Sequence, residues 1–280
     1  MATAKKKAAK KKPAAKKTKK KETALAKQDP KAMAEVGMFD DSGLGFEDAD
    51  KDSYSIPFLS VLQKMSPQCD KDAGEYIKGA EPGMFFNTAT QEVLGDEILV
   101  VPCAYVRQLI EWTPRDQGGG FRGAHAPESM NLATMERDES GRFVMENGNH
   151  LMDTRYHFCL YMTDEGPRQA VVSMSSTQIK TSRNWMTAMR DFRAENPKTK
   201  KKQTVPMMAN IWKLSTITQS NDKGTWKGIK FEHERLLNIP DESDIYLLGK
   251  EFNHQIATGK AQAETPEAAA AATGDSDPLF

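Results

Sequence analysis

Basic residues alternate with aromatic residues at several places in this chain, and together they could bind single-stranded nucleic acid. Cations follow the phosphates, while aromatic faces stack on the bases at ~1–3 kcal/mol for each base. Such stacking tolerates any base, so the mixture predicts binding that is independent of sequence. The candidate residues are Tyr105, Arg107, Trp112, Arg115, Phe121, Arg122, Lys180, Arg183, Trp185, Lys200, Lys201, Lys202, Trp212, Lys213, Trp226, Lys227 and Lys230.

Strand alternation divides these aromatic residues between two faces, so some of them must lie in the core. In a strand, Trp226 and Lys230 face one side, while Lys227 and Phe231 face the other. For each tryptophan, both a core position and a base-stacking position remain open. Glycines on both sides of Trp226 leave it little local cover, which favours base stacking for that residue.

No recognisable catalytic or metal-binding motif accompanies these residues. Glycines 118–120 are not followed by the Lys-Ser/Thr pair of a phosphate-binding loop, and the five histidines are scattered. We therefore expect no enzymatic activity, no cofactor and no metal. A nuclease with Lys230, Glu232 and Glu234 on one strand face is the enzymatic alternative.

The cysteines Cys69, Cys103 and Cys159 are far apart, which favours buried thiols and a reducing, cytoplasmic compartment.

The two ends of the chain differ from its middle in composition. Residues 1–32 contain thirteen Lys against Glu22 and Asp29, with few apolar residues, and we expect this arm to be disordered. It resembles the tails of linker histones, although a solubilising or localisation role is an alternative. An acidic linker (33–53), a β-rich nucleic-acid-binding domain (54–260) and a disordered acidic tail (261–280) follow. No apolar run is long enough for a membrane helix.

The last residues, TGDSDPLF, carry a resemblance to a known family. Asp275, Asp277, Pro278, Leu279 and Phe280 resemble the acidic tip of bacterial and phage single-stranded DNA-binding proteins, although Leu279 interrupts the cellular Pro-Phe ending. The ending Asp-Pro-Leu-Phe is also similar to a sliding-clamp-binding peptide without its usual Gln. The resemblance implies a partner (polymerase, helicase or clamp) at the tip, and often self-association into a homo-oligomer.

Residue periodicity predicts a mainly β (α+β) fold, as an OB-like antiparallel barrel or sandwich with inserted helices. A different α+β sheet is the second choice. Pro102 predicts an edge position or a bulge, and residues 114–129 a loop. We expect helices at 56–65, 176–196 (with Ser176 as N-cap) and 241–255. We expect a strand, a turn and a second short strand within 84–95, and strands at 98–112, 155–163, 169–175, 207–219 and 225–237, with a further hairpin turned at 140–141.

Together these patterns predict a single-stranded DNA-binding protein of the phage type, acting in DNA replication, recombination and repair. A DNA-condensing or virion structural protein that acts through the Lys-rich arm is one alternative. A recombination annealing protein is another.

Overall fold

The computed structural model describes residues 55–261 except Ser140 and Lys223, together with Ala263, Asp40, Leu44, Gly45, Glu47 and Asp48. The side chain of Arg115 is not described. The chain forms two units, Met1–Ala49 and Asp50–Phe280. In the first unit, the backbone N–H of Gly45 donates a hydrogen bond to the Glu47 carboxylate at 2.8 Å. The predicted basic arm, most of the linker and the tail from residue 264 lie outside the described residues.

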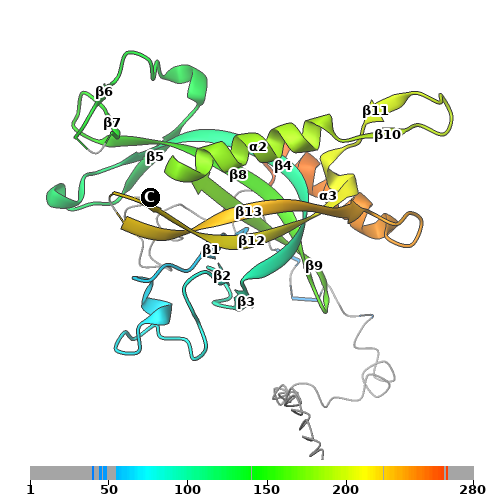
Figure 1. Ribbon diagram of the computed structural model, residues 1–280, viewed down its shortest axis with the longest axis horizontal. Helices are drawn as coiled ribbons and strands as arrows, with labels where there is room; N and C mark the ends of the chain where they lie inside the picture. The colour runs from blue at the N-terminus through cyan, green and yellow to red at the C-terminus, as the bar shows by residue number, and fades with distance from the viewer. Residues whose placement is uncertain are drawn as a thin grey trace, which may run out of the picture. The chain divides into compact units, whose positions relative to one another are not determined.

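An antiparallel sheet of eight strands dominates the second unit (Figure 1). Its strand order is β13-β12-β4-β8-β7-β6, with β5 paired to β4 and β9 paired to β8. The strands are β4 (Glu97–Trp112), β5 (Phe121–His125), β6 (Glu136–Arg137), β7 (Phe143–Val144), β8 (His150–Thr163), β9 (Gly166–Ser175), β12 (Asn210–Asn221) and β13 (Gly224–Leu236). The sheet curls into an open half-barrel, which confirms the predicted mainly β, antiparallel fold.

Smaller elements surround this sheet. Strands β1 (Leu59–Val61), β2 (Phe85–Asn87) and β3 (Val93–Gly95) form a three-stranded sheet, and β10 (Arg193–Glu195) pairs with β11 (Lys202–Thr204). The helices are α2 (Ile179–Asp191) and α3 (Ser243–Ala257). Both helices confirm the periodicity, but α2 ends five residues early because the chain turns into β10. The predicted N-cap at Ser176 is wrong, because Ser176 lies in a short 3-10 turn and Gln178 is the N-cap residue of α2.

The long strands β4 and β8 are the spine of the sheet, paired from Val100 opposite Tyr161 to Trp112 opposite His150. The register shifts between Pro102 and Ala104, so the predicted bulge is confirmed. The bulge, and not the alternative of an edge position, accommodates Pro102, because β4 has neighbours on both sides. The predicted loop at 114–129 is also partly wrong, since β5 within it pairs with the end of β4.

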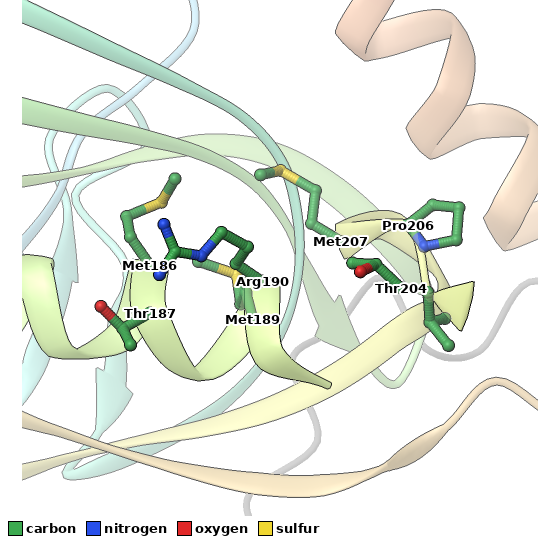
Figure 2. Close-up of a pocket in the computed structure, with 8 residues that line it drawn as sticks. Met186, Thr187, Met189, Arg190, Thr204, Pro206 and Met207 are labelled. Carbon is green, nitrogen blue, oxygen red and sulfur yellow. The ribbon is translucent and has the colours of Figure 1, made fainter. Parts of the chain in front are cut away.

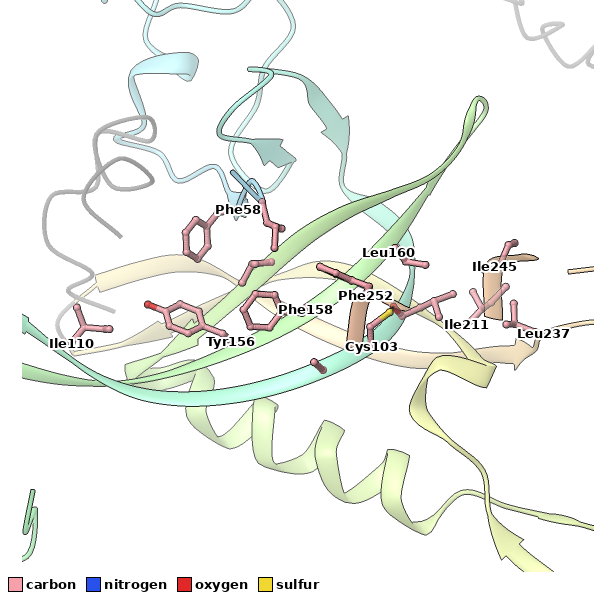
Figure 3. Close-up of a cluster of buried hydrophobic side chains, with 14 residues drawn as sticks. Phe58, Cys103, Ile110, Tyr156, Phe158, Leu160, Ile211, Leu237, Ile245 and Phe252 are labelled. Carbon is pink, nitrogen blue, oxygen red and sulfur yellow. Dashed lines mark hydrogen bonds between the residues drawn. The ribbon is translucent and has the colours of Figure 1, made fainter. Parts of the chain in front are cut away.

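Both faces of the sheet are covered, which explains why β8 is apolar at consecutive positions. Phe158 and Leu160 face a cluster closed by α3, where Phe252 packs edge-on against Phe158 at 6.1 Å between ring centroids (Figure 3). Cys159 and Tyr161 face a second cluster that contains Trp185 of α2. Helix α2 is thereby fixed across one face of the sheet.

The residues on either side of β1 form hydrogen bonds with the two outer strands, β9 and β13. The backbone N–H of Val171 in β9 donates to the Pro57 carbonyl at 2.8 Å. The Gln63 side chain donates to the Lys227 carbonyl at 3.0 Å and accepts from the Lys227 N–H at 2.8 Å. The predicted helix at 56–65 is therefore wrong, because an extended segment supplies partners that both sheet edges need.

Candidate nucleic-acid interface

Three of the four tryptophans expected to face either core or bases are buried. Trp185 is 0% exposed, Trp212 3% and Trp226 9%. Trp185 stacks on His157 of β8 at 4.6 Å between ring centroids and meets Trp212 edge-on at 6.3 Å. Helix α2 lies on the sheet by this face, so neither ring offers a surface to a nucleobase in this conformation.

The expectation that Trp226 has little cover is wrong. Its indole N–H donates to Gln219 Oε1 at 2.9 Å. A side chain at the neighbouring Gly228 would come within 2.6 Å of that same oxygen and still closer to Gln178. The glycine therefore makes room for two glutamine side chains that cover the strand, rather than leaving the tryptophan open.

The candidates on β4 and β5 are largely engaged in packing and ion pairs. Trp112 and Phe121 are half-buried and meet edge-on at 6.0 Å between ring centroids. Arg122 is exposed and donates to Thr113 Oγ1 at 2.6 Å. These residues tie β5 to β4. The side chain of Arg115 lies outside the described part of the chain.

A polar cluster on β4 and β8 brings two guanidinium groups onto one carboxylate. Arg107 and Arg155 each donate two hydrogen bonds to Asp153, at 2.8–3.0 Å. Arg155 also donates to the Tyr105 hydroxyl at 2.8 Å. Burial raises the pKa of Asp153, but the hydrogen bonds and charges of the two arginines outweigh it and hold that pKa below its usual value. One negative and two positive charges leave the cluster cationic.

His157 connects this cluster to α2. Its Nε2 lies 2.8 Å from Ser182 Oγ of α2, and its ring also contacts Tyr105 at 5.3 Å between centroids. Burial, and then the charge of Arg155, lower the pKa of His157 to about 3. The imidazole is neutral near neutral pH, so it fixes α2 in place and adds no charge.

Positive charge is concentrated in one part of the body. Residues 176–230 contain twelve Lys or Arg and three Asp or Glu, whereas residues 55–175 contain ten and seventeen. This stretch covers α2, β10, β11, β12 and the first half of β13. We call its exposed basic residues on α2 and the β10–β11 hairpin the cationic surface: Lys180, Arg183, Arg190, Arg193, Lys198, Lys200, Lys201 and Lys202.

The geometry of α2 explains why this surface is open. Ser182, Trp185 and Met189 point into the sheet, so Lys180 and Arg183 are left in solvent. The β10–β11 hairpin continues from α2 and projects beyond the sheet (Figure 1). Lys200 reaches Glu195 at 3.9 Å, but Lys201 and Lys202 form no ion pair within 4.0 Å with any described residue. These cations are available to phosphates.

Three further basic candidates lie on the β12–β13 hairpin. Lys213 sits between Glu97 and Glu232 at 3.9 and 4.0 Å, so its charge is already balanced. The ammonium of Lys227 donates to Thr218 at 3.0 Å. Lys230 is exposed. The structure thus separates Lys213 and Lys227 from Lys201 and Lys202 of the cationic surface, whereas Lys200 and Arg190 of that surface each lie near one exposed carboxylate, of Glu195 and Asp191.

A cavity of about 410 Å³ opens beside the cationic surface, between α2 and the chain after β11 (Figure 2). We call it the methionine pocket. It is lined by Met186, Thr187, Met189, Arg190, Thr204, Val205, Pro206 and Met207. The sequence predicted a helix that contains Met186 and Met189 but did not reveal the cavity. The charge density of residues 176–230 is the signal that could have drawn attention to Arg190, Arg193 and Lys198.

A second carboxylate, which is buried, has a structural role. Glu111 of β4 is 8% exposed and accepts hydrogen bonds from Asn147 and Asn149, while its other oxygen lies 2.8 Å from His125 Nε2. The Asn149 hydrogen bond is the main cause that lowers the pKa of Glu111. The cluster joins β4, β5 and the turn before β8. Among residues 55–261, 140 and 223 aside, no group of three His, Cys, Asp or Glu is placed to hold a metal ion.

The fold and the site define a mainly β protein whose curled antiparallel sheet carries a cationic helix and hairpin. The chain matches the model of the family described as Pam3 phage gp34-like protein over residues 19–262, and it belongs to that family. It is thus a protein of the bacteriophage type. No curated protein and no solved structure matches it. Within the described residues, no helix is long and apolar enough to cross a membrane.

The five residues of the predicted partner-binding tip, Asp275, Asp277, Pro278, Leu279 and Phe280, lie outside the described residues and beyond the family match.

Proposed function

We propose that this protein binds single-stranded DNA without sequence preference during phage DNA replication or recombination, in the host cytoplasm. The observation that carries the proposal is the cationic surface, where exposed Lys and Arg gather on α2 and the β10–β11 hairpin while the rest of the body is net acidic. A run of accessible cations releases counterions when it meets a phosphate backbone. The arginine pair on Asp153 adds positive charge to the face that α2 covers.

The different positions of the exposed cations and of the hydrogen-bonded titratable groups favour nucleic-acid binding over enzymatic catalysis. The described part of the chain carries exposed cations, whereas the half-buried Asp153 and the buried His157 and Glu111 are each hydrogen-bonded by neighbours that fix the fold. A phosphate backbone needs several cations at moderate spacing and no catalytic group. The cationic surface meets this requirement.

We further propose that Asp275–Phe280 recruits a replication or recombination enzyme. Acidic residues followed by Pro278, Leu279 and Phe280 suit a partner with a basic rim and an apolar pocket. Because this segment is separate in sequence from residues 176–230, DNA binding and recruitment can be tested independently.

The proposal is tested by fluorescence anisotropy with a labelled single strand of about 30 nucleotides and its duplex. The full chain and a chain without residues 1–32 are compared, with circular dichroism as the folding control. We expect both proteins to prefer the single strand, with deletion of the arm weakening binding to both DNAs. If the chain without residues 1–32 no longer binds DNA, that result would favour the DNA-condensing alternative and contradict the proposal.

A further inference from the structure

The described part of the chain offers no exposed aromatic ring for base stacking. Every Phe, Tyr and Trp within it is buried or half-buried. The exposed large hydrophobic residues are aliphatic, as with Met65 and Leu247. Cations alone bind duplex and single strand alike, because both carry phosphates. A preference for single strands therefore needs an apolar site that a paired, stacked base cannot reach.

The methionine pocket is such a site. Met186 and Met189 on α2 face Met207 across the cavity, as Figure 2 shows. Its volume of about 410 Å³ falls in the ~300–1,000 Å³ range of pockets that hold small organic ligands. Thioether sulfur makes favourable contacts with aromatic rings, and the unbranched side chain adapts to rings of different size.

The charge around the pocket matches a nucleotide and not merely an apolar ligand. Arg190 lines the cavity, and its Nε also lies 3.5 Å from the Asp191 carboxylate in an exposed ion pair, which is weak and open to competition by phosphate. Arg193 and Lys202 lie on β10 and β11, immediately beyond the residues that form the two walls. A base within the cavity would thus leave its flanking phosphates beside cations.

We propose that the methionine pocket receives one unstacked base of a single DNA strand, with the adjacent phosphates on Arg190 and the basic β10–β11 hairpin. The inference rests on the proposed function and explains its strand preference, because a base in a duplex would have to leave the stack to enter. The polar side chains of the lining are Thr187, Arg190 and Thr204, too few to read a base edge in detail. The pocket accordingly accepts any base.

The test compares an oligothymidylate with an abasic oligonucleotide of equal length, using the full chain and anisotropy. Salt is set at about 200 mM to weaken contacts made by charge alone. We expect roughly tenfold tighter binding of the oligothymidylate, in line with contacts of one base with the methionine side chains of the pocket. The double variant Met186→Gln/Met207→Gln should reduce that ratio below about threefold, with abasic affinity unchanged. Met65→Gln, at a methionine that is 88% exposed, is the matched control and should keep the ratio.

The outcomes separate the two proposals. Equal binding of both oligonucleotides by the wild-type chain would overturn the pocket inference and leave single-strand binding through phosphates intact. Binding of neither would overturn the proposed function itself. If the double variant fails to fold, methyl NMR of the wild-type chain decides. Oligothymidylate must then shift the methyl signals of Met186 and Met207 while the abasic strand does not, and equal shifts would refute the inference.

Discussion

Three exposed lysines at the tip of the β10–β11 hairpin give the sharpest prediction. Lys200, Lys201 and Lys202 are exposed, so Lys→Gln at all three should change the free energy of unfolding by less than about 0.5 kcal/mol per site. Each phosphate contact contributes ~0.7 to the slope of log affinity against log salt for single strands, so the slope should fall by about 2. Between about 50 and about 200 mM salt, wild type should then lose roughly 20-fold more affinity than the variant.

Anisotropy titrations at those salt concentrations measure both slopes. The control is Lys→Gln at Lys64, Lys71 and Lys78, which are also exposed but lie outside residues 176–230. We expect the control to keep the wild-type slope. Parallel slopes for wild type and the Lys200–Lys202 variant would refute the assignment of phosphate contacts to the hairpin. An equal drop in the control would show that net charge, and not this surface, governs binding.

Three further predictions concern the core, pH and the tail. Trp185→Ala should lower the free energy of unfolding by ~3–5 kcal/mol in urea titrations, because the ring is fully buried. Arg183→Ala on the same helix should weaken DNA binding with little loss of stability, because this side chain is exposed. The reverse pattern would contradict the orientation of α2. Below pH 6.5 His157 is protonated in the unfolded chain but not in the folded chain, where its pKa is about 3. The free energy of unfolding should therefore fall with decreasing pH by up to ~1.4 kcal/mol per pH unit. His157→Gln should remove that slope. Deletion of 275–280 should preserve DNA affinity while abolishing capture of polymerase, helicase or clamp, and unchanged capture would reject the proposed role of the tail.

Local sequence patterns correctly predicted the elements whose buried face is determined by residues near one another in the sequence. The β8–β9 and β12–β13 hairpins and the helices α2 and α3 follow from alternation, turn residues and helical period, and all four are present. The segment 56–65 was predicted as a helix because the sequence reveals only the local conformational preference of these residues. Its extended form is set by the free edges of β9 and β13, which are distant in sequence.

The candidate interface was harder to predict for the same reason. Periodicity places Trp185 on one face of a helix, but cannot say whether that face meets a sheet or solvent. The methionine pocket requires residues 186–190 and 204–207 to lie opposite each other, a consequence of the β10–β11 turn. The lysines of that hairpin were identified because a charged cluster in a turn stays in solvent whatever the surrounding fold.

Ultraviolet crosslinking of a single-stranded oligonucleotide to the full chain, followed by mass spectrometry of the peptides, tests the central claim most directly. The account predicts crosslinks within residues 180–207, on α2 and the β10–β11 hairpin, that are lost when duplex replaces the single strand. Crosslinks confined to residues 1–32, or equal crosslinking by duplex, would contradict a single-strand interface on the folded body.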